Sequence, residues 1–178
     1  RIVPTRYFDW PTATRRSSDA EVMDKFTLQN PVFATYVIAA TLAILKLASM
    51  SWLTVVRMVQ QNGGYRSPED TKLTPMNKNP SPQQTDRNES VERVRRVHQN
   101  DLENLPLFIF SAGLFVLTDP SLLVARILFY GYVASRFAHS LAYLSAVTHD
   151  TRAKLWTPGS LILIFMTVRT LLAALSIV

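Results

Sequence analysis

Long apolar segments alternate along this chain with polar segments that contain most of its charged residues. The apolar runs cover residues 33–56, 105–117, 121–147 and 158–178. A helix of about 20 apolar residues crosses the roughly 30 Å hydrocarbon core of a bilayer, where only helices and closed barrels satisfy their backbone groups. The pattern therefore predicts an all-α fold, an integral membrane four-helix bundle.

Residues at the edges of these runs set the expected helix ends. We expect helices over residues 30–59, 89–117 and 121–147, then a fourth with Pro158 in its first turn that continues to residue 178. Pro106 falls inside the second helix and is expected to kink it, because proline lacks a backbone N–H donor.

Polar segments connect the predicted helices. The segment over residues 60–88 contains several prolines among Lys, Asn, Gln and Ser, so we expect a mobile loop without a core of its own. A short loop after the third helix carries His149, Asp150, Arg152 and Lys154.

Residues 1–29 are predicted to form an irregular extension of a membrane domain over residues 30–178. Residues 1–22 precede Met23 and lack the apolar core of a signal peptide. We interpret Met23 as a start and residues 1–22 as a segment without a role in the fold.

The formal net charge is +6, and the chain contains no cysteine. Basic residues are concentrated between the first two helices: Arg57, Arg66, Lys72, Lys78, Arg87, Arg93, Arg95 and Arg96. This clustering follows the positive-inside rule, so we expect the first and third loops to face the cytosol and expect no nucleic-acid partner. Any sulfur chemistry must use the sulfur of a substrate, and no His or carboxylate cluster has the spacing of a metal site.

Several ionisable residues lie inside the predicted spans: Lys46, Arg136, His139 and Arg169. Each costs about 2.5–3.5 kcal/mol unless it faces the bundle interior or water. Snorkelling to the interface suits Arg126, and for Arg169 both interpretations stay open. The spacing predicts Glu103 as the only carboxylate near these cations, so we expect the interior to hold surplus positive charge that attracts an anionic ligand.

Helical spacing places some of these residues on two stripes. Arg96, Asn100 and Glu103 share one helix face, and Arg136, His139 and Tyr143 share another. Two rows of donors with one carboxylate suit a small zwitterion that has several carboxylates and one ammonium. The alternatives for the first stripe are a solvated helix with internal salt bridges and a patch for anionic lipid head groups.

The segment over residues 91–104, VERVRRVHQNDLEN, resembles the signature of the MAPEG superfamily of membrane proteins in eicosanoid and glutathione metabolism. Residues 68–70 (PED), residues 136–143 (RFAHSLAY) and Arg152-Ala153 follow in matching order. The resemblance covers residues 30–178 and is greatest to the microsomal glutathione S-transferase branch. It implies a homotrimer of four-helix bundles in the endoplasmic reticulum or the mitochondrial outer membrane, with membrane lipid around it.

The resemblance also implies that glutathione binds between subunits as a co-substrate. Residues at matching positions would bind it: Arg57, Arg96, Asn100, Glu103, Arg136, His139 and Tyr143. Arg152 would face the thiol as the catalytic residue, with Asp70 as a possible catalytic partner. The implied function is conjugation of glutathione to lipophilic electrophiles, together with reduction of lipid hydroperoxides.

Two other functions within the family remain open. One is a glutathione-dependent prostaglandin E synthase, against which Gln99 and Ala153 argue, because the synthase has arginine and serine there. The other is a non-catalytic adaptor that presents lipid. Outside the family, a small channel with a charged pore lining is a further alternative.

Overall fold

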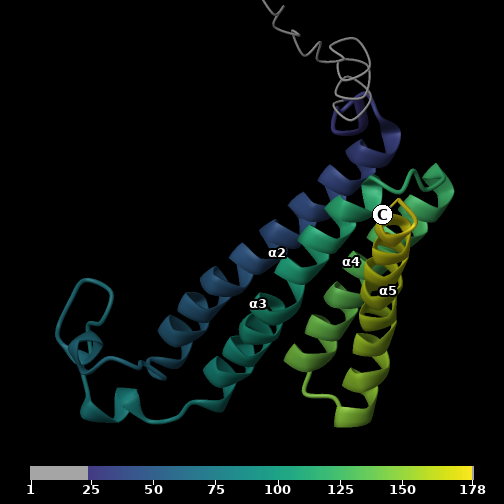
Figure 1. Cartoon of the computed structure of the whole chain (residues 1–178). Coiled ribbons are helices and arrows are strands. Elements are labelled where there is room, and N and C mark those ends of the chain that lie inside the picture. Colours follow the sequence, from purple (N-terminus) through teal and green to yellow (C-terminus); the bar gives the residue numbers. More distant parts are fainter. Residues whose placement is uncertain (1–23, 178) are drawn as a thin grey trace, which may run out of the picture.

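The computed structural model describes residues 24–177, so the expectations for residues 1–22 and Met23 lie outside the described residues. Four long α-helices make up most of this part of the chain (Figure 1). They are α2 (Pro31–Gln61), α3 (Glu89–Val116), α4 (Leu122–Leu144) and α5 (His149–Leu175). Two short 3₁₀ helices, η1 (Pro68–Thr71) and η2 (Pro82–Thr85), lie between α2 and α3. Residues 24–177 contain no strand, which confirms the all-α prediction.

The helices pack as two antiparallel pairs, α2 beside α3 and α4 beside α5 (Figure 1). The segment between α2 and α3 lies at the same end of the bundle as the turn between α4 and α5 (Figure 1). The turn between α3 and α4 lies at the opposite end, with the C-terminus. The polar segment between α2 and α3 and the start of α5 therefore lie at one end of the molecule.

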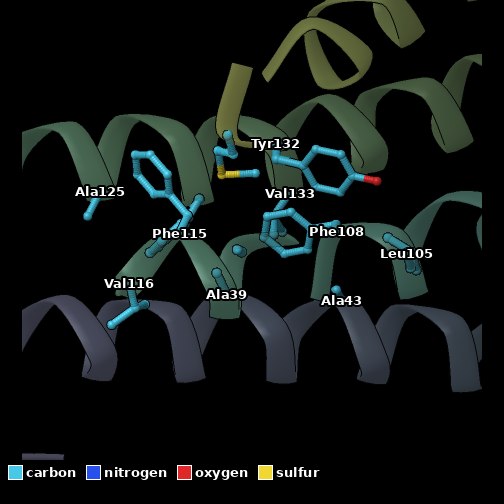
Figure 2. Close-up of a cluster of buried hydrophobic side chains, with 12 residues drawn as sticks. Ala39, Ala43, Leu105, Phe108, Phe115, Val116, Ala125, Tyr132 and Val133 are labelled. Atoms are coloured by element: carbon cyan, nitrogen blue, oxygen red, sulfur yellow. The ribbon is translucent and has the colours of Figure 1, made fainter. Parts of the chain in front are cut away.

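The hydrophobic core runs along the middle of the bundle and uses side chains of unequal size. Ala39 and Ala43 of α2 are almost fully buried, and their small side chains let α3 approach closely. Larger side chains from α3 and α4 fill the centre, where the rings of Phe108 and Tyr132 stack at 4.1 Å between centroids (Figure 2). Such offset and stacked aromatic pairs add to the stabilisation from burial alone.

The outer surface of the bundle is apolar. Helices α2 and α5 are long and apolar enough to cross a membrane, and only 11% of the most apolar stretch of α5 is buried inside the chain. Ile164, Phe165 and Leu172 of α5 are among the exposed large side chains. An exposed apolar surface of this extent matches a lipid or subunit environment rather than water.

Helix α5 begins earlier than the sequence predicted. Its first residue is His149, so Arg152 lies in the first turn of a helix rather than in a loop, and Pro158 lies inside the helix. The hydroxyl of Ser135 on α4 makes this possible. It donates to the carbonyl of Leu155 at 2.8 Å and accepts from the N–H of Gly159 at 3.1 Å, so it bridges backbone groups on either side of the proline.

The segment between α2 and α3 is not the structureless loop that its composition predicted. The side chains of Asn77 and Gln84 are 3% exposed and form reciprocal amide hydrogen bonds of 2.7 and 3.1 Å. Gln84 also donates to the Asn62 side chain at the C-terminal cap of α2, at 2.7 Å. We call Asn62, Asn77 and Gln84 the amide cluster. It replaces the missing hydrophobic core of this segment with satisfied polar groups.

Candidate functional site

A basic pocket of about 370 Å³ opens at the end of the bundle where α3 and α5 begin and α4 ends. Its walls come from the first turns of α3 and α5 and from the last turn of α4. The lining residues are Glu89, Arg93, Arg96, Tyr143, Ala146, Val147 and Arg152. Three guanidinium groups and one carboxylate therefore surround a space whose volume falls in the usual range for small-molecule sites.

Glu89 neutralises part of the positive charge in this pocket. Its carboxylate accepts a hydrogen bond from Arg96 and lies 3.7 Å from a guanidinium nitrogen of Arg93. The hydrogen bond from Arg96 holds the pKa of the Glu89 carboxyl below its usual value. The Glu89 side chain remains 54% exposed, so a competing carboxylate in solution can reach the same arginines.

Arg152 is placed by an aromatic side chain. Its guanidinium lies 4.3 Å from the centroid of the Tyr143 ring, a distance typical of a cation–π contact. The ring of Tyr143 in turn meets the imidazole of His139 edge to face at 5.8 Å between centroids. Because α5 is already helical at residue 152, a regular element holds the arginine at the pocket wall.

A buried ionic cluster lies deeper in the bundle. The carboxylate of Asp101 on α3 pairs with the ammonium of Lys46 on α2 and lies 3.5 Å from a guanidinium nitrogen of Arg136 on α4. The same nitrogen of Arg136 donates to the side-chain oxygen of Asn100. Lys46, Asp101 and Arg136 are at most 3% exposed. We call these three residues the ionic cluster.

The ionic cluster corrects the prediction that Glu103 is the only carboxylate near the interior cations. Glu103 is exposed and accepts a hydrogen bond from Gln99 at 3.2 Å. Asp101 is the interior carboxylate, and the sequence carried a signal for it. It continues the buried stripe of Val94, Val97 and Leu105 on α3, where a charged residue at an apolar position indicates a buried ion pair.

Some buried polar atoms near the pocket have no hydrogen-bond partner. Among the described residues these atoms are Nε of Arg136, Nδ1 of His139, Oγ of Ser140 and Nε of Arg152. All four belong to α4 or to the first turn of α5. Unsatisfied buried polar groups cost about 1–3 kcal/mol each, and of these four residues Arg152 lines the basic pocket, where a polar ligand can satisfy its Nε.

Three predicted site residues lie away from the basic pocket. Arg57 is on the last turns of α2 and contacts Gln60 at 3.5 Å. Asp70 is exposed on η1 and lines a separate cavity of about 260 Å³. Glu103 faces outward from α3. A single chain therefore brings together Arg96, Tyr143 and Arg152 at the pocket. Asn100, Arg136 and His139 lie deeper in the bundle. Arg57, Asp70 and Glu103 lie outside the pocket.

The other two membrane-depth arginines face outward. Arg126 near the start of α4 is exposed, as expected for a snorkelling side chain. Arg169 on α5 is also exposed and lies beside an apolar groove with Leu161 and Phe165. Its position favours the snorkelling interpretation over an interior role.

Comparisons with known proteins agree with this architecture. A sequence model of the MAPEG family matches residues 36–172. Microsomal glutathione S-transferase 1 of Sus scrofa is 33% identical over 126 residues, which cover 70% of this chain and 79% of the relative. The same enzyme of Mus musculus is 32% identical over 145 residues, 81% of this chain and 92% of the relative. Prostaglandin E synthase of Homo sapiens is 26% identical over 135 residues, 75% of this chain and 84% of the relative.

The family match covers well over half of the chain and includes every helix that forms the basic pocket and the ionic cluster. The chain therefore belongs to the MAPEG family and is a membrane four-helix bundle.

Proposed function

We propose that this protein is a membrane-bound glutathione S-transferase that activates the glutathione thiol for attack on lipophilic electrophiles. The observation that carries this proposal is the basic pocket. Three arginines line it, and the Nε of one of them, Arg152, has no hydrogen-bond partner, so the pocket can bind an anionic ligand. The transferase relatives, at 32–33% identity, support the choice of glutathione.

The charges of glutathione match those of the pocket and its surroundings. The tripeptide has two carboxylates, one ammonium and a thiol. Arg96 and Arg93 are placed to bind a carboxylate, because guanidinium groups form paired, charge-assisted hydrogen bonds with carboxylates. The ammonium requires a carboxylate, and Glu103 takes that role in our proposal, from the exposed face of α3.

Arg152 supplies the chemistry at sulfur. A free thiol has a pKa of about 8.5, so only a few per cent is thiolate at pH 7. Lowering that pKa to about 6.5 makes roughly three-quarters of it thiolate and requires about 2.7 kcal/mol of differential stabilisation. One guanidinium in a partly dry site can supply this amount.

The reaction then needs little else from the protein. The thiol proton passes to water, the thiolate sulfur attacks the electrophilic carbon, and the leaving group departs with the electron pair of the broken bond. With a lipid hydroperoxide, the thiolate attacks the terminal oxygen and releases the alcohol, and a second glutathione reduces the resulting sulfenic acid to give the disulfide and water. The apolar outer faces of α2 and α5 give the lipid-soluble substrate access.

The assembly in this proposal is a homotrimer with a site at each subunit boundary. Arg57, Asp70 and Glu103 lie outside the basic pocket of their own chain but face outward, where a neighbouring subunit can meet them. We place the protein in the endoplasmic reticulum membrane. The segment between α2 and α3, which holds Arg66, Lys72, Lys78 and Arg87, and the turn between α4 and α5 then face the cytosol.

A second candidate is a glutathione-dependent prostaglandin E isomerase, favoured by the synthase relatives at 25–26% identity. Incubation with a prostaglandin endoperoxide and product analysis separates the two. Isomer formed faster than conjugates with model electrophiles would favour the second candidate.

The proposal is tested with purified protein in detergent. Glutathione added to the wild-type protein is expected to produce thiolate absorbance, with turnover of a chloronitrobenzene electrophile. Arg152→Ala should still bind glutathione but lose most of the thiolate signal, and turnover at pH 7 should fall about 25-fold, because the thiolate fraction drops from roughly three-quarters to a few per cent.

Lys154→Ala is the matched control, because Lys154 is an exposed cation near the same helix start and does not line the pocket. It should leave both signals unchanged. Wild-type protein that neither binds glutathione nor forms thiolate would overturn the proposed function.

A further inference from the structure

The ionic cluster does more than balance charge, because it reaches a side chain beneath the basic pocket. Arg136 donates to the side-chain oxygen of Asn100 with the same nitrogen that faces Asp101. Arg136 is 1% exposed, and the Asp101 carboxylate that lies 3.5 Å from this nitrogen is itself fully buried. The buried carboxylate therefore restricts where the guanidinium can lie, and Asn100 contacts it there.

The contact with Arg136 fixes which way the Asn100 amide points. A guanidinium carries only donors, so the atom of Asn100 that faces it must be the carbonyl oxygen. The amide NH₂ of Asn100 then points away from the ionic cluster. Asn100 is half-buried, so these two N–H donors lie at the edge of the interior.

Helical spacing places these donors below the pocket. Asn100 lies four residues after Arg96, one turn deeper on the same face of α3, and His139 lies one turn deeper than Tyr143 on α4. Arg96 and Tyr143 both line the pocket. Asn100 and His139 therefore form the next layer inward.

We propose that Asp101 and Arg136 are positioning residues that orient Asn100 as a hydrogen-bond donor to glutathione. This inference rests on the proposed function and adds a specific route to it: Asp101 holds Arg136, Arg136 holds the Asn100 oxygen, and the Asn100 amide donates to an acceptor of the bound tripeptide. Lys46 completes the charge balance of Asp101 from α2.

Asn100→Asp tests the last link while keeping an acceptor for Arg136. The new carboxylate still accepts from Arg136, so the bundle should fold, but the outward donors are gone. Glutathione affinity measured by calorimetry should fall about tenfold or more, the range for hydrogen bonds to charged groups. Normal affinity in a wild-type-like fold would overturn the inference.

A double-mutant cycle tests the first link. Asp101→Asn and Asn100→Ala should each lower the affinity for glutathione. The double variant should bind glutathione no less tightly than the single variant with the lower affinity, because both substitutions break the same chain of contacts. Two effects that add in full would show that Asp101 acts on binding independently of Asn100 and would overturn the first link. If Asp101→Asn does not fold, Asn100→Asp still tests the last link, and its failure alone overturns the inference.

Asp119→Asn is the matched control, since Asp119 pairs with Lys25 at 2.5 Å at the opposite end of the bundle. It should bind glutathione as the wild type does. If the wild-type protein does not bind glutathione, the proposed function itself is wrong. If the wild type and Asn100→Asp both bind glutathione normally, only the positioning role is wrong.

Discussion

Asp101 and Glu89 lie on the same helix, and each carboxylate holds more than one basic side chain, yet their surroundings differ completely. Asp101 is fully buried and pairs with Lys46 and Arg136. The Glu89 side chain is 54% exposed and pairs with Arg96, with Arg93 at 3.7 Å also in reach. The same chemistry is therefore present at the interior and at the mouth of one site.

The difference between the two carboxylates lies in what can replace them. Nothing from solution reaches Asp101, so losing it leaves buried cations that desolvation makes costly. Water or a ligand carboxylate reaches Glu89, and exposed ion pairs contribute little net free energy. Asp101 is thus suited to holding its partners in a fixed geometry, and Glu89 is suited to being replaced by a ligand carboxylate.

Asp101→Ala should have the largest effect. Removing one partner of a buried ion pair costs about 3–5 kcal/mol, because Lys46 and Arg136 remain inside without their counter-charge. We expect a large fall in the thermal unfolding temperature in detergent, or loss of folded protein on size-exclusion chromatography. Unfolding at the wild-type temperature would show that the cluster is open to water.

An apolar replacement of the whole ionic cluster sharpens this result. In Lys46→Met, Asp101→Leu, Arg136→Met, no buried charge remains and the side-chain shapes are approximately kept, so stability should recover relative to Asp101→Ala. Glutathione affinity should stay low, since Asn100 has lost Arg136. Normal glutathione affinity in the triple variant would show that the ionic cluster does not contribute to glutathione binding.

Gln84→Ala should have an intermediate effect, because the amide cluster is buried but uncharged. The variant leaves side-chain groups of Asn62 and Asn77 without partners, at a cost of about 1–3 kcal/mol. Limited proteolysis should cut the segment between α2 and α3 faster than in the wild type. Gln83→Ala is the control, since Gln83 is exposed, and equal cleavage of both variants would contradict a role for the amide cluster.

Helices were predictable from the sequence because membrane segments carry a strong signal in hydrophobic length alone. The place of Pro158 inside α5 was not, because the Ser135 hydroxyl that bridges the backbone groups around it comes from another helix. Composition likewise suggested a mobile loop over residues 60–88. It cannot show that two amides such as Asn77 and Gln84 face each other after a turn.

The candidate site divides in the same way. Helical spacing predicted one stripe of Arg96, Asn100 and Glu103 and another of Arg136, His139 and Tyr143, and the rings of His139 and Tyr143 do meet. Asp101 is not on the polar stripe of α3 but on its apolar stripe, where Val97 and Leu105 mark the position as buried. Arg57 and Asp70 follow from family resemblance alone, and in the proposed trimer a second subunit would have to bring them to Arg152.

Glu89→Gln should have the smallest effect, and in the opposite direction. Glu89 occupies Arg96 where our proposal places a glutathione carboxylate, so ligand and side chain compete for the same donors. Removing the negative charge should tighten glutathione binding by about two- to fivefold, the range for an exposed ion pair. The measurement is calorimetry with the purified protein at low ionic strength, and the gain should shrink with added salt because the pair is exposed.

Glu92→Gln provides the comparison that makes this small change interpretable. Glu92 also lies in the first turn of α3 and its pKa is also lowered by a neighbouring arginine, Arg95, but it does not line the basic pocket. Its substitution should leave glutathione affinity unchanged. Weaker glutathione binding by Glu89→Gln would mean that the Glu89 carboxylate binds the glutathione ammonium. Glu89 would then contact the ligand directly and would not be displaced by it.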